Sequence, residues 1–188
     1  ACSTRRRSRR RAAMNAGLST PALFGFIGRS GAGKTTLILD VIACLRGQGF
    51  VVSAIKRAHD GLDLDRPGKD SWRMREAGCR EVMVVGERRF ALLHEYRDAP
   101  EPGPLELAQR LAGADIVLFE GFRSAPIPMI EVFRPSLGRP MLFPECRSVV
   151  AIATDGAVDC PLPVLDLAQP AAIAAFVLAH LGIGAPVR

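Results

Sequence analysis

Residues 28–35 read Gly-Arg-Ser-Gly-Ala-Gly-Lys-Thr and match G-x-x-x-x-G-K-[ST], a pattern whose residue types suit the binding of a nucleoside triphosphate. Glycines let successive backbone N–H groups approach and face the phosphate oxygens. Lys34 would bring a positive charge to the β- and γ-phosphates, and the Thr35 hydroxyl is a ligand for Mg²⁺. A glycine-rich turn with an incidental lysine is the structural alternative. We expect the phosphates to contact Gly28, Ser30, Gly31, Ala32, Gly33, Lys34, Thr35 and Thr36.

The segments around this stretch are those that a phosphate site needs. Residues 23–27 form an apolar run of strand length, and residues 36–46 repeat apolar residues at three- and four-residue spacing, which predicts a helix. The start of that helix would add unpaired N–H groups and the positive end of its dipole. A second apolar run follows at 50–55. Strand, helix and strand joined by short connections predict parallel pairing and a right-handed crossover.

The remaining pattern extends this α/β arrangement. We predict a three-layer P-loop NTPase fold, in which a mainly parallel sheet gains an antiparallel hairpin and carries helices on both faces. We expect one domain over 20–188, preceded by a basic, disordered tail over 1–19. The expected elements are helices at 69–77, 105–111 and 171–181, a hairpin at 82–93, and strands at 115–120, 130–133, 148–153 and 163–166.

Composition excludes several classes of protein. Of the 188 residues, 48% are hydrophobic and 23% charged, which is typical of a globular chain. No apolar run reaches the roughly 18 residues of a membrane span, so we expect no membrane insertion. The five cysteines lack metal-finger spacing and indicate a reducing, cytoplasmic location. The net charge of +6 belongs to residues 1–13, which hold six arginines and no acid. These arginines leave a nucleic-acid-binding module open as an alternative, unless Met14 is the natural start.

A second chemical signal is Glu120, which follows a continuous apolar strand and precedes a glycine. In P-loop proteins such an acid lies beside Mg²⁺, so we expect Thr35 and Glu120 to organise the metal. The alternative is a buried strand whose glutamate merely emerges at its edge. Asp115, at the opposite end of the strand, is the weaker candidate.

A polar loop at 56–71 begins where the second strand ends, which is where open α/β sheets place their ligand crevice. It is a candidate for contact with phosphate, Mg²⁺ or substrate, although a solvated surface loop would have a similar composition. The candidate residues are Lys56, Asp65, Lys69 and Asp70.

Together these motifs resemble the molybdopterin-guanine dinucleotide biosynthesis protein B (MobB) family over about residues 23–181. Residues 63–71 match the family's D-x-D-x-P-G-K-D-S, and residues 115–122 are similar to its D-x-x-x-x-E-G-F. Residues 130–134 are similar to its I-E-V-x-R, and 151–155 to the loop that holds the guanine base. The chain departs from the family pattern at Arg123, where a lysine is usual, and at Met129, where a cation is lost.

The resemblance implies a GTP- and Mg²⁺-binding protein in which Thr154 and Asp155 hold the base. A carboxylate at 155 would accept both the N1–H and the 2-amino group of guanine, a donor pair that adenine lacks. The alternative role of Asp155 is to cap the turn that Asp-Gly favours.

The resemblance also implies an accessory role beside a molybdopterin guanylyltransferase, with molybdopterin or molybdenum cofactor as a further partner and a homodimer as the assembly. It implies weak GTPase activity at most, for which Lys34, Glu120 and Arg123 are the catalytic candidates. Two other functions stay open. One is a small-metabolite kinase with Asp65 or Asp70 as base, and the other is a nucleic-acid module that uses the arginine tail.

Overall fold

The computed structural model describes residues 20–58, 65–111 and 113–184, so the predicted tail over 1–19 lies outside the described residues. Contacts divide the chain into two compact units. The larger unit combines the part of the chain up to residue 57 with the part from residue 104 onward, and the smaller unit spans 58–103. The sequence pattern predicted one domain over 20–188. The structure shows that the smaller unit is inserted between the second strand and the following helix of the larger one.

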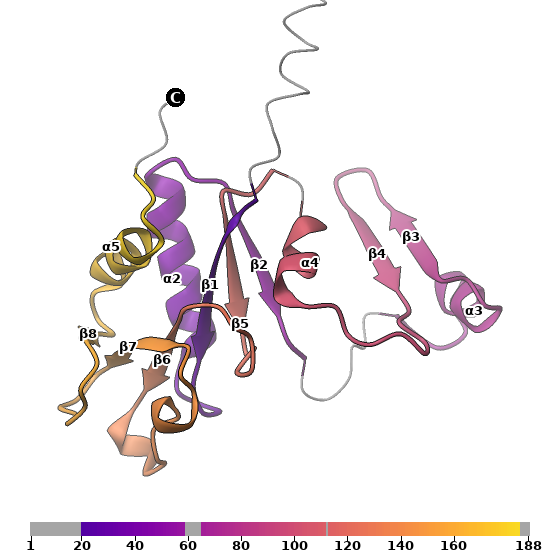
Figure 1. The fold of residues 1–188 in the computed structure, drawn as a ribbon. Helices are drawn as coiled ribbons and strands as arrows, with labels where there is room; N and C mark the ends of the chain where they lie inside the picture. The colour runs from indigo at the N-terminus through magenta and orange to yellow at the C-terminus, as the bar shows by residue number, and fades with distance from the viewer. Residues whose placement is uncertain (1–19, 59–64, 112, 185–188) are drawn as a thin grey trace, which may run out of the picture. The chain divides into compact units, whose positions relative to one another are not determined.

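The larger unit is an α/β structure whose sheet is parallel throughout (Figure 1). In its described part, the six strands have the order β2-β5-β1-β6-β7-β8, which confirms the predicted fold class. Its elements are β1 (Ala22–Ile27), α2 (Lys34–Gly47), β2 (Val52–Lys56), α4 (Pro104–Gln109), β5 (Ile116–Glu120), β6 (Met129–Phe133), β7 (Val149–Thr154), β8 (Val164–Asp166) and α5 (Pro170–Leu181), with 3-10 turns η1 (Pro135–Leu137) and η2 (Phe143–Glu145).

Apolar side chains cover both faces of this sheet, because successive residues of a strand point to opposite sides. On one face Phe24 and Phe26 are fully buried beneath α2 and α5, which lie side by side in Figure 1. On the other face Phe119 packs in a cluster that includes Ala108 of α4 and Phe122. Truncating such a buried phenylalanine to alanine costs about 3–5 kcal/mol. The two clusters therefore hold the strand ends in fixed positions.

Helix α2 forms where the sequence predicted it. Its buried residues recur at three- and four-residue spacing and face the sheet, and the helix ends just before Gly49, which has a φ of 97°. Leu39 is 61% exposed on the opposite side. The buried residues are Leu37, Ile38, Val41 and Leu45.

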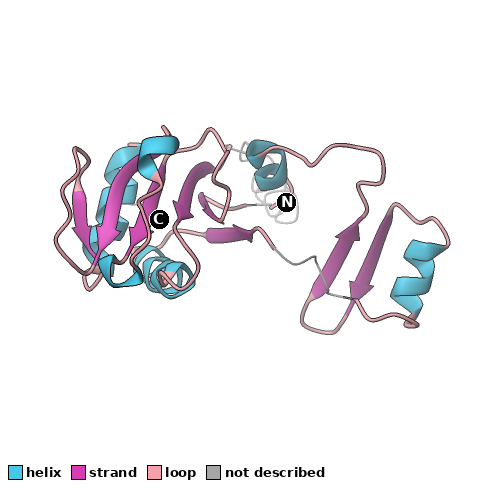
Figure 2. Ribbon diagram, turned by 90° about the horizontal axis from the view of Figure 1, so that it is seen from below, coloured by secondary structure: helices cyan, strands magenta, loops and turns pink. Residues whose placement is uncertain are grey.

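The smaller unit contains α3 (Asp70–Glu76) and the hairpin of β3 (Glu81–Val85) and β4 (Phe90–His94). The hairpin was predicted correctly, but the prediction that it adds to the parallel sheet was wrong. In the described residues β3 and β4 pair only with each other, with α3 beside them (Figure 2). A two-stranded sheet needs further contacts to be stable, and here α3 supplies them.

Ion pairs join the segments of the smaller unit. Arg75 of α3 donates to Asp65, at 3.0 Å, and to Glu95, at 2.6 Å. Lys69 occupies the cap position of α3 without a side-chain hydrogen bond, and the Ser71 hydroxyl donates to Asp65. Two residues of α3, Ser71 and Arg75, thus hold the Asp65 carboxylate. In the part of the chain that the structure describes, no helix is both long enough and apolar enough to cross a membrane.

Candidate functional site

The carboxyl ends of the parallel strands meet at one edge of the sheet, which is the edge where open α/β sheets bind ligands. Strand β1 lies in the middle, with β5 on one side and β6 on the other. The chain segment that follows β1 is the glycine loop, residues 28–35. Around it lie Lys56 at the end of β2, Glu120 at the end of β5 and Arg134 after β6. Thr154 ends β7, and Asp155 follows it.

The glycine loop has a backbone that other residues would not adopt. Gly28, Gly31 and Gly33 have φ values of 154°, 79° and 89°. At Gly28 a Cβ atom would also lie 2.3 Å from the carbonyl oxygen of Val132. The glycines of the motif are therefore required by the course of the chain, as the sequence pattern predicted.

The loop leads directly into α2 with its N-terminal N–H groups uncapped. Gly33 occupies the cap position without a side-chain hydrogen bond, and the first turn carries no acidic residue. Such a helix start attracts an anion through its free N–H groups and its dipole. The adjoining Ser30, Gly31 and Thr36 are exposed, whereas Ala32 is buried.

Lys34 folds back over the loop. Its Nζ donates to the carbonyl oxygens of Gly28 and Arg29, both at 3.0 Å. Burial lowers the pKa of Lys34, an effect that Glu120 opposes and Lys56 reinforces. The ammonium group is thus held at the mouth of the glycine loop, where it can meet a phosphate.

Thr35 and Glu120 lie next to each other, as the sequence predicted for metal ligands. The Thr35 hydroxyl donates to Glu120 Oε1 at 2.9 Å, and Lys56 Nζ lies 3.4 Å from each of these two oxygens. A hydroxyl and a carboxylate are oxygen ligands that suit Mg²⁺. Among the described residues no cluster of three His, Cys, Asp or Glu could hold a metal. The Thr35 hydroxyl and the Glu120 carboxylate fit Mg²⁺, which usually keeps several water ligands beside one or two protein oxygens.

On the other side of the glycine loop, Asp155 pairs with Arg134. Arg134 Nε also donates to the carbonyl oxygen of Ala32 at 3.0 Å. The buried Thr154 hydroxyl exchanges hydrogen bonds with Gly156 at 3.2 Å, so it shapes the turn after β7. The part that Thr154 would take in base binding stays a prediction.

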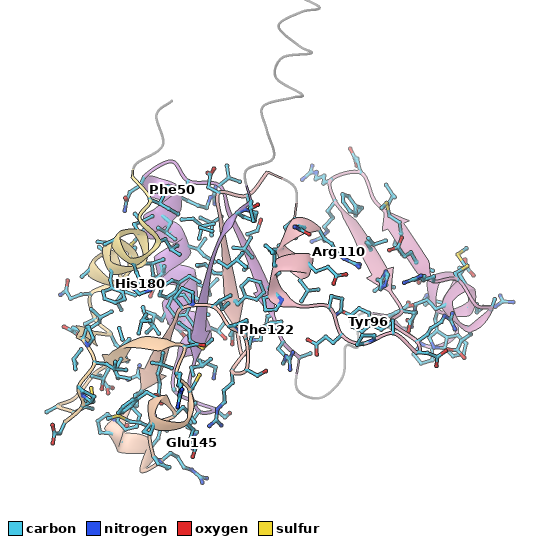
Figure 3. The ribbon with its side chains drawn as sticks, viewed as in Figure 1. Phe50, Tyr96, Arg110, Phe122, Glu145 and His180 are labelled. Carbon is cyan, nitrogen blue, oxygen red and sulfur yellow. The ribbon has the colours of Figure 1, made fainter. Side chains whose placement is uncertain are left out.

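Arg123, the third catalytic candidate, forms a surface ion pair with Glu145, which is labelled in Figure 3. The backbone carbonyl of Arg123 accepts a hydrogen bond from the Cys146 thiol at 3.2 Å. The two contacts hold residue 123 against the last residue of η2 and the residue that follows it. Its catalytic role stays a prediction.

Asp65, Lys69 and Asp70 belong to the smaller unit. Burial alone would raise the pKa of Asp65, but hydrogen bonds from Ser71 and Arg75 lower it. Two residues of α3 therefore already donate hydrogen bonds to its carboxylate. Contact of these three residues with a nucleotide stays a prediction.

Sequence reasoning missed Glu131, which is fully buried in β6. Its carboxylate accepts the N–H groups of Leu142, at 2.7 Å, and Phe143, at 2.9 Å. This contact anchors the segment 135–147, whose Pro140 carbonyl also accepts Arg29 Nε at 3.5 Å. An acid between Ile and Val in a buried strand was the signal that could have revealed this anchor.

We expect Glu131→Gln to lower the free energy of unfolding by about 1–3 kcal/mol at pH 7, because the amide NH₂ would face a backbone N–H donor. Urea titration measures this, with the exposed Glu106→Gln as the matched control, expected to stay within about 0.5 kcal/mol. Equal stability of wild type and Glu131→Gln would contradict the anchoring role.

The same variant has an expected pH dependence. Burial raises the pKa of Glu131 above its ordinary value of 4.5, against the opposing Leu142 and Phe143 N–H groups. Above pH 4.5 the unfolded chain releases a proton that the folded chain retains, so this residue's contribution to stability falls as the pH rises. The stability advantage of wild type over Glu131→Gln should therefore be largest at low pH.

The sheet order, the glycine loop and the uncapped start of α2 define the class of protein first: this is an α/β protein with the P-loop NTPase fold. A solved structure of molybdopterin-guanine biosynthesis protein B (MobB) shares this fold, with a TM-score of 0.66 and 26% identity. The comparison covers 84% of this chain and 99% of the solved one.

Sequence comparison then gives the family. The family model of molybdopterin guanine dinucleotide synthesis protein B, MobB, matches residues 23–155. The molybdopterin-guanine dinucleotide biosynthesis adapter protein of Haemophilus influenzae is 38% identical over 159 residues, which are 82% of this chain and 86% of the relative. The adapter protein of Escherichia coli is 36% identical over 166 residues, 87% and 95% of the two chains. The chain belongs to the MobB family, and the resemblance inferred from its motifs is confirmed.

Proposed function

We propose that this chain binds GTP with Mg²⁺ and assists the conversion of molybdopterin to molybdopterin guanine dinucleotide in molybdenum cofactor biosynthesis. The observation that carries the proposal is that the glycine loop, the Thr35–Glu120 pair and Asp155 gather at one edge of the parallel sheet. Together they offer partners for the phosphates, the metal and the base of one nucleotide. The names of the Haemophilus influenzae and Escherichia coli relatives support the pathway.

Each group has a defined part in holding the nucleotide. The N–H groups at the start of α2 and the Lys34 ammonium bind the phosphate oxygens. Thr35 and Glu120 hold the Mg²⁺, which neutralises phosphate charge when bound. Asp155 accepts the N1–H and 2-amino groups of guanine, a pair that adenine does not offer. Lys56, whose Nζ lies 3.4 Å from Glu120 Oε1, partly compensates the carboxylate charge.

Chemistry at the γ-phosphate is expected to be slow. Rapid GTP hydrolysis requires a residue that orients water and an arginine on the transferring phosphoryl group. Arg123 is paired with Glu145, so recruiting it would require breaking that surface pair. We therefore propose an accessory protein with weak GTPase activity at most, which delivers GTP to a separate molybdopterin guanylyltransferase. The relatives' designation as adapter proteins supports a role beside a partner. We also propose that the chain acts in the cytoplasm as a homodimer.

A reconstituted reaction tests this function. Purified molybdopterin guanylyltransferase, molybdopterin and limiting GTP are mixed with Mg²⁺, and molybdopterin guanine dinucleotide is quantified with and without the chain. We expect the wild-type chain to raise the yield several-fold and Asp155→Asn to lose most of that gain, because a lost charged hydrogen bond costs about 1.5–3 kcal/mol. Asp159→Asn, an exposed neighbour with the same charge change, is the control.

Two results would contradict the proposal. No stimulation by the wild-type chain would remove the role in dinucleotide formation. Nucleotide consumption that rises sharply when a small acceptor is added would favour a metabolite kinase instead.

A further inference from the structure

Arg134 joins two parts of the candidate site that come from different strands. It follows β6, which pairs with β1 on one side and with β7 on the other. Its Nε donates to the carbonyl oxygen of Ala32, inside the glycine loop, at 3.0 Å. Its Nη1 pairs with the Oδ2 of Asp155, after β7. One guanidinium group therefore spans from the phosphate end of the site to the base end.

We propose that Arg134 is a positioning residue that couples recognition of the guanine base to binding of the phosphates, a role that rests on the proposed GTP function. Its planar guanidinium group orients the Asp155 carboxylate for the base. The same group fixes the glycine loop for the phosphates. Both ends of the site therefore depend on Arg134 for their geometry.

The phosphate end depends on this contact because of where Ala32 lies. Ala32 stands between Gly31 and Gly33, which both have left-handed φ values, of 79° and 89°. Glycines leave the loop backbone many accessible conformations, so a tertiary contact helps to fix one of them. Arg134 supplies it, and its Nη2 comes within 3.4 Å of the point where a Cβ on Gly33 would lie. The guanidinium thus also places positive charge beside the start of α2.

The base end depends on the same guanidinium group, because the hydrogen bond from Arg134 fixes the orientation of the Asp155 carboxylate. A guanidinium has five N–H donors in a rigid plane, and a carboxylate has about four acceptor positions. The pair with Arg134 uses one oxygen of Asp155 and leaves acceptor positions for the base. A carboxylate held in this way has one orientation, and its hydrogen bonds to a ligand lose less conformational entropy.

Three ligands separate the two ends in binding experiments with the full-length chain. GTP contacts both ends of the site. ITP lacks the 2-amino group that would donate a hydrogen bond to Asp155, and inorganic tripolyphosphate reports on the phosphate end alone. The ratio of GTP to ITP affinity measures base recognition, and a residue that only stabilises the fold would not change it. Calorimetric titrations with Mg²⁺ give all three affinities.

For Arg134→Gln we expect GTP affinity to fall about tenfold or more and the GTP/ITP ratio to fall towards one, with a smaller loss for tripolyphosphate. Arg134→Lys keeps the charge and should restore tripolyphosphate binding. It should not restore the GTP/ITP ratio, because an ammonium group cannot serve Ala32 and Asp155 from one rigid plane. Arg46→Gln makes the same charge change at the far end of α2 and should alter none of these values.

A double-mutant cycle completes the test. In an Asp155→Asn background, Arg134→Gln should have little further effect on the GTP/ITP ratio, while Asp155→Asn alone should not weaken tripolyphosphate binding. Parallel losses for GTP and ITP with an unchanged ratio would overturn the coupling role, and so would additive effects in the cycle. Failure of the wild-type chain to bind GTP with Mg²⁺ would overturn the proposed function itself. A thermal unfolding scan of each variant separates loss of binding from loss of fold.

Discussion

Replacing Gly28 by alanine is expected to abolish measurable GTP binding and to lower stability. The new Cβ atom would lie 2.3 Å from the Val132 carbonyl oxygen, well inside van der Waals contact, and the residue has a φ of 154°. Both obstacles are backbone features, so no side chain can move aside to relieve them. Overpacking and backbone strain each cost about 1–3 kcal/mol, and relief requires the glycine loop to shift. Because the shifted loop would no longer direct its N–H groups at the phosphates, GTP affinity should fall by at least about a hundredfold.

Calorimetry and chemical denaturation of Gly28→Ala measure both effects. Gly47→Ala is the matched control, because a Cβ there meets nothing within 4 Å and the position has no left-handed φ. It should leave GTP affinity unchanged and stability equal or slightly higher. Wild-type GTP affinity in Gly28→Ala would mean that the loop does not hold the phosphates.

The parts of the structure that the sequence predicted well are those coded by short-range pattern. Residues 36–46 repeat their apolar side chains at helical spacing, and the structure has α2 there. The apolar run that ends in Glu120 became a buried central strand with its acid beside Thr35. In each case the information lies within a few neighbouring residues, and burial on the sheet reinforces the local preference.

The parts that sequence reasoning missed depend on contacts between distant residues. Arg134 and Ala32 are 102 positions apart, and only the order of the strands brings them together. Glu131 anchors the 135–147 segment through backbone N–H groups. An acid in an apolar strand indicates a buried contact, but the side-chain pattern does not identify its backbone partners. The apolar pattern of residues 82–93 predicted the hairpin, but it does not identify the strands that pair with the hairpin's edges. In the described residues the hairpin forms a separate sheet.

Lys34→Ala is the second substitution with a large expected effect. The Lys34 ammonium is held by two carbonyl oxygens at the mouth of the glycine loop, so little conformational entropy remains to be lost when a phosphate binds. Because two of the three ammonium donors are used by these carbonyls, one charge-assisted hydrogen bond to phosphate remains. Together with the attraction between the ammonium and phosphate charges, it is worth about 3 kcal/mol, which corresponds to roughly a hundredfold in affinity. Arg46→Ala removes a positive charge from the other end of the same helix and should leave the affinity within about twofold of wild type.

The most direct test is a calorimetric titration of GTP with Mg²⁺ into the wild-type and Lys34→Ala chains side by side. We expect one site per wild-type chain and a loss of roughly a hundredfold in affinity for Lys34→Ala, with the fold intact. Undiminished GTP affinity in Lys34→Ala would contradict the account, because the nucleotide would then bind somewhere other than the glycine loop.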